Sequence, residues 1–132
     1  MDLTNLPKVD FLHNSNELLN LIKNNPELPI YFVTNDEDCI GDNVNTIMTF
    51  CTSYVTEMFT AIPPWSNDYY DYAKFYDDRI EFEEDLENYL IDENIDNCEE
   101  LSDDDFDKLV KSYLATLEPY WQKVICIRIY NN

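Results

Sequence analysis

The sequence predicts an α+β protein, with an antiparallel or mixed β-sheet of about four to five strands and two to three helices. In residues 123–130, one face is wholly apolar, with Ile125, Ile127 and Ile129, and the other is mostly apolar, with Val124 and Cys126, which is typical of a strand packed on both faces. Residues 102–117 instead repeat their apolar side chains with helical spacing, at Phe106, Leu109, Val110, Tyr113, Leu114 and Leu117. A chain that holds both patterns, without an internal repeat, is expected to pack helices on a sheet.

The first two elements are expected between residues 15 and 33. Ser15 can cap a short helix, and Pro26 ends that helix because proline has no amide hydrogen to donate. Residues 30–33 then form a β-branched and aromatic run, which predicts the first strand. Residues 1–14, which precede these elements, are expected to be a loosely ordered segment of the single domain 1–132.

Residues 46–62 are compatible with both kinds of element. Their large apolar side chains fit helical spacing, whereas their threonines, valine and aromatic residues favour strands. We predict two strands or one bent strand here, ended by Pro63 and Pro64. An aromatic and acidic connection over residues 65–76 is expected to lead to a short strand at 79–82 and a helix from Glu83.

The clearest helix is expected to begin after Ser102. The Ser102 side chain can cap the helix, and the three aspartates at 103–105 suit the positive end of the helix dipole. Glu118 and Pro119 are expected to end it, before the closing strand.

Charge is the most unusual property of the chain. It carries 28 Asp and Glu against 8 Lys and Arg, a net charge of −20. Between residues 68 and 107 there are 18 carboxylates and only two basic side chains, Lys74 and Arg79. Such a field repels nucleic acid and anionic membranes and attracts surfaces rich in Lys and Arg. A hydrophobic content of 45% favours a folded chain over a disordered one.

The sequence shows little that could support catalysis or cofactor binding. His13 is the only histidine and Gly41 the only glycine, which excludes glycine-rich phosphate loops. The four cysteines show no C-x-x-C spacing, so buried thiols are expected rather than a metal clamp. We therefore predict no enzyme activity, no metal and no cofactor, although a pair of carboxylates in a pocket could still hydrolyse sugars. Without a leader-like or membrane-spanning run, a cytoplasmic location in a bacterial host cell is expected.

The acidic tract allows two interpretations. Charge runs are usually solvated faces, but solubility needs a net charge of only about 2 to 8. The larger excess favours a surface that competes with nucleic acid for a basic groove, unless the organism lives in high salt. Aromatic side chains among the acids could serve as anchors or could belong to the core. The predicted partner-binding residues are Trp65, Asp68, Tyr69, Tyr70, Asp71, Tyr72, Asp77, Asp78, Glu81, Glu83, Glu84, Asp85 and Glu87.

Three segments resemble small acidic proteins encoded by phages and prophages of low-GC Gram-positive bacteria. These segments are residues 21–30, with the sequence LIKNNPELPI, residues 76–82, YDDRIEF, and residues 121–129, WQKVICIRI. In size, charge and aromatic-acidic character the chain also looks like several anti-CRISPR proteins. Some of those proteins occupy the DNA-binding channel of a Cas nuclease.

The sequence and this resemblance together predict a phage-encoded acidic inhibitor of a host nucleic-acid-binding defence protein. The expected target is the DNA-binding groove of a Cas effector such as Cas9, blocked by DNA mimicry. The partner would thus be a basic protein, with no direct binding of nucleic acid or membrane, and the inhibitor a monomer or homodimer. The alternative is a non-enzymatic interaction or regulatory module, which could be homodimeric, whose charge only provides solubility.

Overall fold

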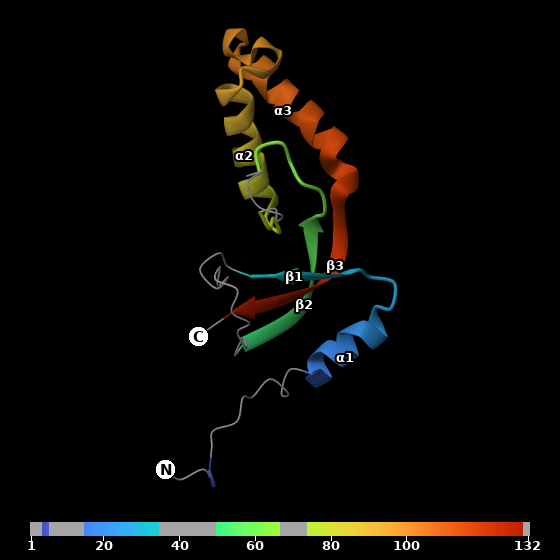
Figure 1. Ribbon diagram of the computed structural model, residues 1–132. Coiled ribbons are helices and arrows are strands. Elements are labelled where there is room, and N and C mark those ends of the chain that lie inside the picture. The colour runs from blue at the N-terminus through green and yellow to red at the C-terminus, as the bar shows by residue number, and fades with distance from the viewer. Residues whose placement is uncertain (1–3, 6–14, 35–49, 67–73, 131–132) are drawn as a thin grey trace. The chain divides into compact units, whose positions relative to one another are not determined.

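The computed structural model describes residues 4–5, 15–34, 50–66 and 74–130, which contain three α-helices, two 3-10 helices and three strands (Figure 1). The chain divides into two compact units, Met1–Thr56 with Lys123–Asn132, and Glu57–Gln122. We call them the sheet unit and the helical unit. The predicted α+β class is confirmed. The described residues contain three α-helices and two short 3-10 helices, where two to three helices were expected, and their sheet has three strands instead of four to five.

The sheet unit is built around the closing strand. The sheet contains β1 (Ile30–Val33), β2 (Phe50–Phe59) and β3 (Trp121–Tyr130) in the order β1-β3-β2, and β1 runs parallel to β3. Ile30 lies opposite Ile125, whose amide also donates a hydrogen bond of 2.9 Å to the Pro29 carbonyl. Residues 124–127 of β3 are all buried, as the unbroken apolar run predicted for a central strand.

The remaining elements of the sheet unit agree with the sequence signals. Helix α1 (Ser15–Asn24) is followed by Asn25, whose backbone amide bonds to the Leu21 carbonyl at 3.0 Å, just before Pro26. Strand β2 is one ten-residue strand, so the preference of its threonine, valine and aromatic residues for extended backbone outweighs their helical spacing. Residues 46–49 of the predicted strand segment lie outside the described residues.

The helical unit begins its first helix earlier than predicted. Helix α2 spans Arg79–Asp92, so the short strand expected at residues 79–82 is wrong. The Asp78 carboxylate accepts a hydrogen bond of 2.9 Å from the Ile80 amide and thereby caps the helix. In a strand, Ile80 and Phe82 would share one face; here Ile80 is 69% exposed and Phe82 only 1%. Phe82 instead lies on the buried helical face formed with Leu86 and Leu90.

A tight connection joins α2 to the next helix. It contains the 3-10 helix η3 (Ile95–Glu100) and three residues with left-handed backbone, Asn94, Asp96 and Asn97. Asn and Asp adopt this conformation more readily than other non-glycine residues. Helix α3 (Asp103–Leu117) follows, and the Ser102 hydroxyl accepts the predicted capping bond from the Asp105 amide at 3.2 Å. The 3-10 helix η4 (Glu118–Tyr120), which contains Pro119, ends the helical segment as predicted.

Two hydrophobic clusters hold the helical unit together. One contains Leu86, Leu90, Cys98 and Val110, and joins α2, η3 and α3. The other contains Phe59, Tyr76 and Phe82, with Leu114, Leu117 and Trp121 partly buried against it. Trp65 packs against both clusters. The expected burial of thiols is observed for Cys98, and for Cys126 in the sheet unit.

Candidate functional site: the acidic helix α2

The predicted partner-binding residues divide into three groups in the structure. Asp68, Tyr69, Tyr70, Asp71 and Tyr72 lie outside the described residues. Trp65 is half-buried, and its ring lies 5.2 Å from Phe82 and 5.7 Å from Tyr89, centroid to centroid. The rest lie just before α2 or on it, namely Asp77, Asp78, Glu81, Glu83, Glu84, Asp85 and Glu87. Helix α2 is therefore the described part of the candidate site.

Lys74 pairs with two carboxylates of α2. Its Nζ lies 2.7 Å from Glu81 Oε1 and 2.8 Å from Asp85 Oδ2. The Tyr76 hydroxyl donates a hydrogen bond to the same Asp85 oxygen and accepts one of 2.7 Å from Trp65 Nε1. A continuous network thus joins Trp65, Tyr76, Asp85 and Lys74, and it ties the segment before α2 to the first turns of the helix.

The pKa values of this network follow from its contacts. Burial tends to raise the pKa of the Asp85 carboxyl, but the bonds from Lys74 and Tyr76 outweigh burial and lower it below 3.8. Hydrogen bonds to Asp85 and Glu81 hold the Lys74 pKa well above its ordinary value. Burial, followed by the bond to Asp85, raises the pKa of Tyr76 to about 12. Asp85 and Lys74 are consequently charged at neutral pH, whereas Tyr76 is neutral.

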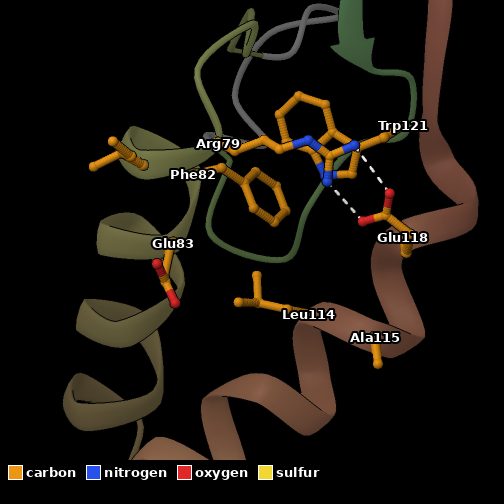
Figure 2. Close-up of a pocket in the computed structure, with 8 residues that line it drawn as sticks. Arg79, Phe82, Glu83, Leu114, Ala115, Glu118 and Trp121 are labelled. Carbon is orange, nitrogen blue, oxygen red and sulfur yellow. Dashed lines mark hydrogen bonds and ion pairs between the residues drawn. The ribbon is translucent and has the colours of Figure 1, made fainter.

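Arg79, the other basic residue of the acidic tract, holds two acids from distant parts of the helical unit. Its Nη1 and Nη2 lie 2.6 and 2.9 Å from the two Glu118 oxygens, and its Nη2 lies 2.6 Å from Glu57 Oε1 (Figure 2 shows the Glu118 pair). The guanidinium also stacks over the Trp121 ring at 4.5 Å. The hydrogen bonds from Arg79 lower the pKa of the Glu118 carboxyl. Both cations of the tract are thus used within the helical unit.

Among the described acids that form no ion pair with a basic side chain, four act together at α2. Glu83, Glu84 and Glu87 on α2, together with Asp107 on α3, form what we call the acidic patch. Burial raises the pKa of Glu87, and the charges of Glu83, Asp107 and Glu84 raise it further. Within the described part of the chain, neither Lys108 nor Lys111 lies within ion-pair distance of a carboxylate. The patch is therefore a concentration of negative charge that the fold tolerates at a cost.

The structure separates residues that looked equivalent in the sequence. Glu81, Asp85 and Asp78 have defined structural roles as ion-pair partners or as a helix cap. The shared face of Glu83 and Glu87 follows from their i, i+4 spacing. The contribution of Asp107, 20 positions after Glu87, has no such signal in the sequence, because it depends on how α3 packs against α2.

The described part of the candidate site is made chiefly of carboxylates on α2. Among the described residues, no three His, Cys, Asp or Glu side chains are grouped so as to hold a metal ion. No helix in that part of the chain is both long enough and apolar enough to cross a bilayer.

Comparison with protein-family models, curated proteins and solved structures finds no match to this chain.

Proposed function

We propose that the protein is an acidic inhibitor, encoded by a phage, that occupies the nucleic-acid-binding groove of a host defence protein. A Cas effector such as Cas9 is the favoured target, because effectors of this kind hold nucleic acid in a positively charged channel. The inhibitor would present carboxylates where the groove expects phosphates. No chemical step is required, so the proposed protein is not an enzyme.

The observation that supports this proposal is the internal use of both cations of the tract. Lys74 and Arg79 are paired within the helical unit, so they do not neutralise the acidic patch. Mutual repulsion, which contributes to the raised pKa of Glu87, makes the patch unfavourable for the isolated protein. A surface lined with Lys and Arg would relieve that repulsion and gain favourable contacts.

The helical support of the patch suits mimicry of a nucleic acid. Four residues of an α-helix rise about 6 Å, which separates Glu83 from Glu87 along α2. Two phosphate steps along one DNA strand rise about 6.8 Å. The rise between Glu83 and Glu87 along the helix axis is thus close to the axial rise between every second phosphate of one DNA strand.

The test compares two variants with the same change of charge. Glu83→Lys with Glu84→Lys and Glu87→Lys reverses the patch, whereas Glu27→Lys with Glu93→Lys and Glu99→Lys reverses three exposed acids elsewhere. Calorimetric titration into guide-loaded Cas9 without target DNA should show a loss of affinity of at least about 10-fold for the patch variant, and a smaller loss for the control. A tenfold loss corresponds to about 1.4 kcal/mol.

Salt and DNA competition complete the test. Raising NaCl from 0.1 to 0.5 M should weaken the wild-type complex, because salt screens charge pairs. Target DNA should compete with the wild-type protein for the effector. Equal affinity at both salt concentrations, with circular dichroism showing both variants folded, would refute the proposal.

A second candidate is an interaction module whose charge serves only solubility. Its support lies in the sheet unit, where Ile30 and Phe32 share one face of β1 and are 41% and 70% exposed. Apolar side chains exposed in this way can join two copies or recruit a partner. The same titration separates the two candidates, since apolar binding depends little on salt.

A further inference from the structure

A small surface cavity lies in the helical unit beside the acidic patch. It has a volume of about 310 Å³ and lies where the start of α2, the end of α3 and Trp121 meet (Figure 2). Ligand pockets usually measure about 300 to 1,000 Å³, so this one is at the small end of the range. Its size suits a single long side chain. The lining residues are Arg79, Ile80, Phe82, Glu83, Leu114, Ala115, Glu118 and Trp121.

The cavity combines an apolar lining with negative charge. Phe82 and Leu114 point into the space between the helices, and Glu83 projects from α2 at its edge (Figure 2). Within the described parts of the chain, Glu83 has no basic side chain at ion-pair distance. The one cation of the lining, Arg79, is already bound by Glu118 and Glu57. The cavity is thus lined by one guanidinium that two carboxylates already hold, and by a further carboxylate, Glu83, that has no ion pair among the described residues.

We propose that this cavity receives an arginine side chain of the partner, and the proposal rests on the proposed function because it assumes a basic partner protein. The aliphatic stem would pack on Leu114, and the guanidinium would bind Glu83. Arginine can bury its stem along apolar surface while its head stays hydrated or paired. Its guanidinium is more weakly hydrated than the lysine ammonium and binds a carboxylate through two parallel hydrogen bonds.

This inference assigns different tasks to neighbouring acids of α2. Glu84 is exposed and does not line the cavity, so it contributes only to the general field. Glu83 lines the cavity and would make a defined contact. The cavity would therefore add position and side-chain specificity to an attraction that charge alone makes non-directional.

The test uses a pair of peptide probes on the full chain. Acetyl-Gly-Arg-Gly-amide and the same peptide with citrulline have nearly the same shape, but only the first is charged. In an NMR titration, the arginine peptide should shift the amide signals of Leu114 and Ala115 and the indole signal of Trp121. Half of the full shift should be reached at a millimolar peptide concentration. The citrulline peptide should bind at least fivefold more weakly.

Two pairs of variants make the result specific. Glu83→Gln should weaken binding of the arginine peptide at least fivefold, whereas Glu84→Gln, with the same loss of charge one residue away, should change it less than twofold. Ala115→Leu narrows the cavity at an exposed position without altering charge and should also weaken binding. Ser112→Leu, an enlargement of similar size at an exposed residue of α3 that does not line the cavity, serves as its control.

The possible outcomes separate this inference from the proposed function. Equal binding of the two peptides, or equal effects of Glu83→Gln and Glu84→Gln, would overturn the arginine site. Such a result would not bear on the proposed function, which the titrations of the lysine variants into the effector test separately. Arginine-selective binding by a protein that fails to compete with DNA would instead refute the proposed function and keep the site.

Discussion

The raised pKa of Glu87 shows that burial of its carboxylate and repulsion within the acidic patch lower the stability of the folded protein. Its pKa is raised above 4.5 in the folded protein, so the folded state binds a proton there more tightly than the unfolded chain does. Folding is therefore favoured as pH falls through the raised pKa, and the charged carboxylate lowers stability at higher pH. The partner-free protein is in this respect less stable at pH 7 than its packing would allow.

Glu87→Gln should consequently stabilise the protein at neutral pH. We expect a rise in Tm of about 1–3 °C at pH 7, which is small because the side chain is partly exposed and its charge is screened. The gain should shrink as the pH falls through the raised pKa of Glu87 toward 4.5, in thermal unfolding followed by circular dichroism. Glu99→Gln, which removes one charge outside the patch, serves as control. A wild-type protein more stable than Glu87→Gln at pH 7 would contradict the electrostatic explanation.

Ion pairs between residues far apart in the sequence explain why the candidate site could be predicted only in part. The carboxylates of α2 were recognised from the sequence as a charged group, and the i, i+4 spacing of Glu83 and Glu87 is consistent with the face that they share. Which acids are neutralised was not predictable, since Arg79 pairs across 22 positions to Glu57 and across 39 to Glu118. Such pairs depend on tertiary packing and leave no local pattern in the sequence.

Helix ends show how well individual elements could be predicted. The start of α3 was correct because a serine followed by three aspartates is a strong local signal. The start of α2 was missed because Ile80 and Phe82 alternate with charged residues, which imitates a strand. The spacing of Phe82, Leu86 and Leu90, with Asp78 ahead of them, contained the helical signal. The left-handed backbone of three residues in the α2–α3 connection has no local sequence signal as strong as these.

The cap of α3 provides a quantitative prediction for an element. Ser102→Ala removes the acceptor of the Asp105 amide and should lower the free energy of unfolding by about 1 kcal/mol. Urea unfolding should show this as a lower midpoint with an unchanged slope. Ser112→Ala makes the same replacement on an exposed position inside α3 and should cost little, because alanine favours helices. Equal losses for the two variants would show that the cap does not stabilise α3.

At the scale of the whole molecule, the excess of acidic over basic residues opposes the folded state. The net charge of −20 is confined to a smaller volume in the folded protein than in the unfolded chain, so repulsion is stronger when folded. Burial of the two hydrophobic clusters and of β3 must overcome this repulsion. Composition predicted a folded chain and the apolar patterns predicted its α+β class, while the sheet formed by the described residues has three strands, fewer than the four to five expected.

Salt should therefore stabilise the free protein. Raising NaCl from 0.05 to 0.5 M shortens the screening length from above 10 Å to below 8 Å and should raise Tm by several degrees. The variant with lysine at positions 83, 84 and 87 has six fewer net negative charges and should gain less from the same salt. Differential scanning calorimetry on both proteins measures the difference. A Tm that does not depend on salt would show that self-repulsion is unimportant for folding.

The positions of the two tryptophans make the helical unit separately observable. Trp65 donates its indole hydrogen to Tyr76, and Trp121 lies beneath the Arg79 guanidinium, so the two indoles have different polar surroundings within the same unit. The sequence has no other tryptophan. Intrinsic indole emission is thus a spectroscopic reporter for this unit, and tyrosine or backbone signals are needed to follow the sheet unit. If the contact between Arg79 and Trp121 opened, the emission of Trp121 would change. A Trp65→Phe variant, in which Trp121 is the single tryptophan, would allow that change to be measured by itself.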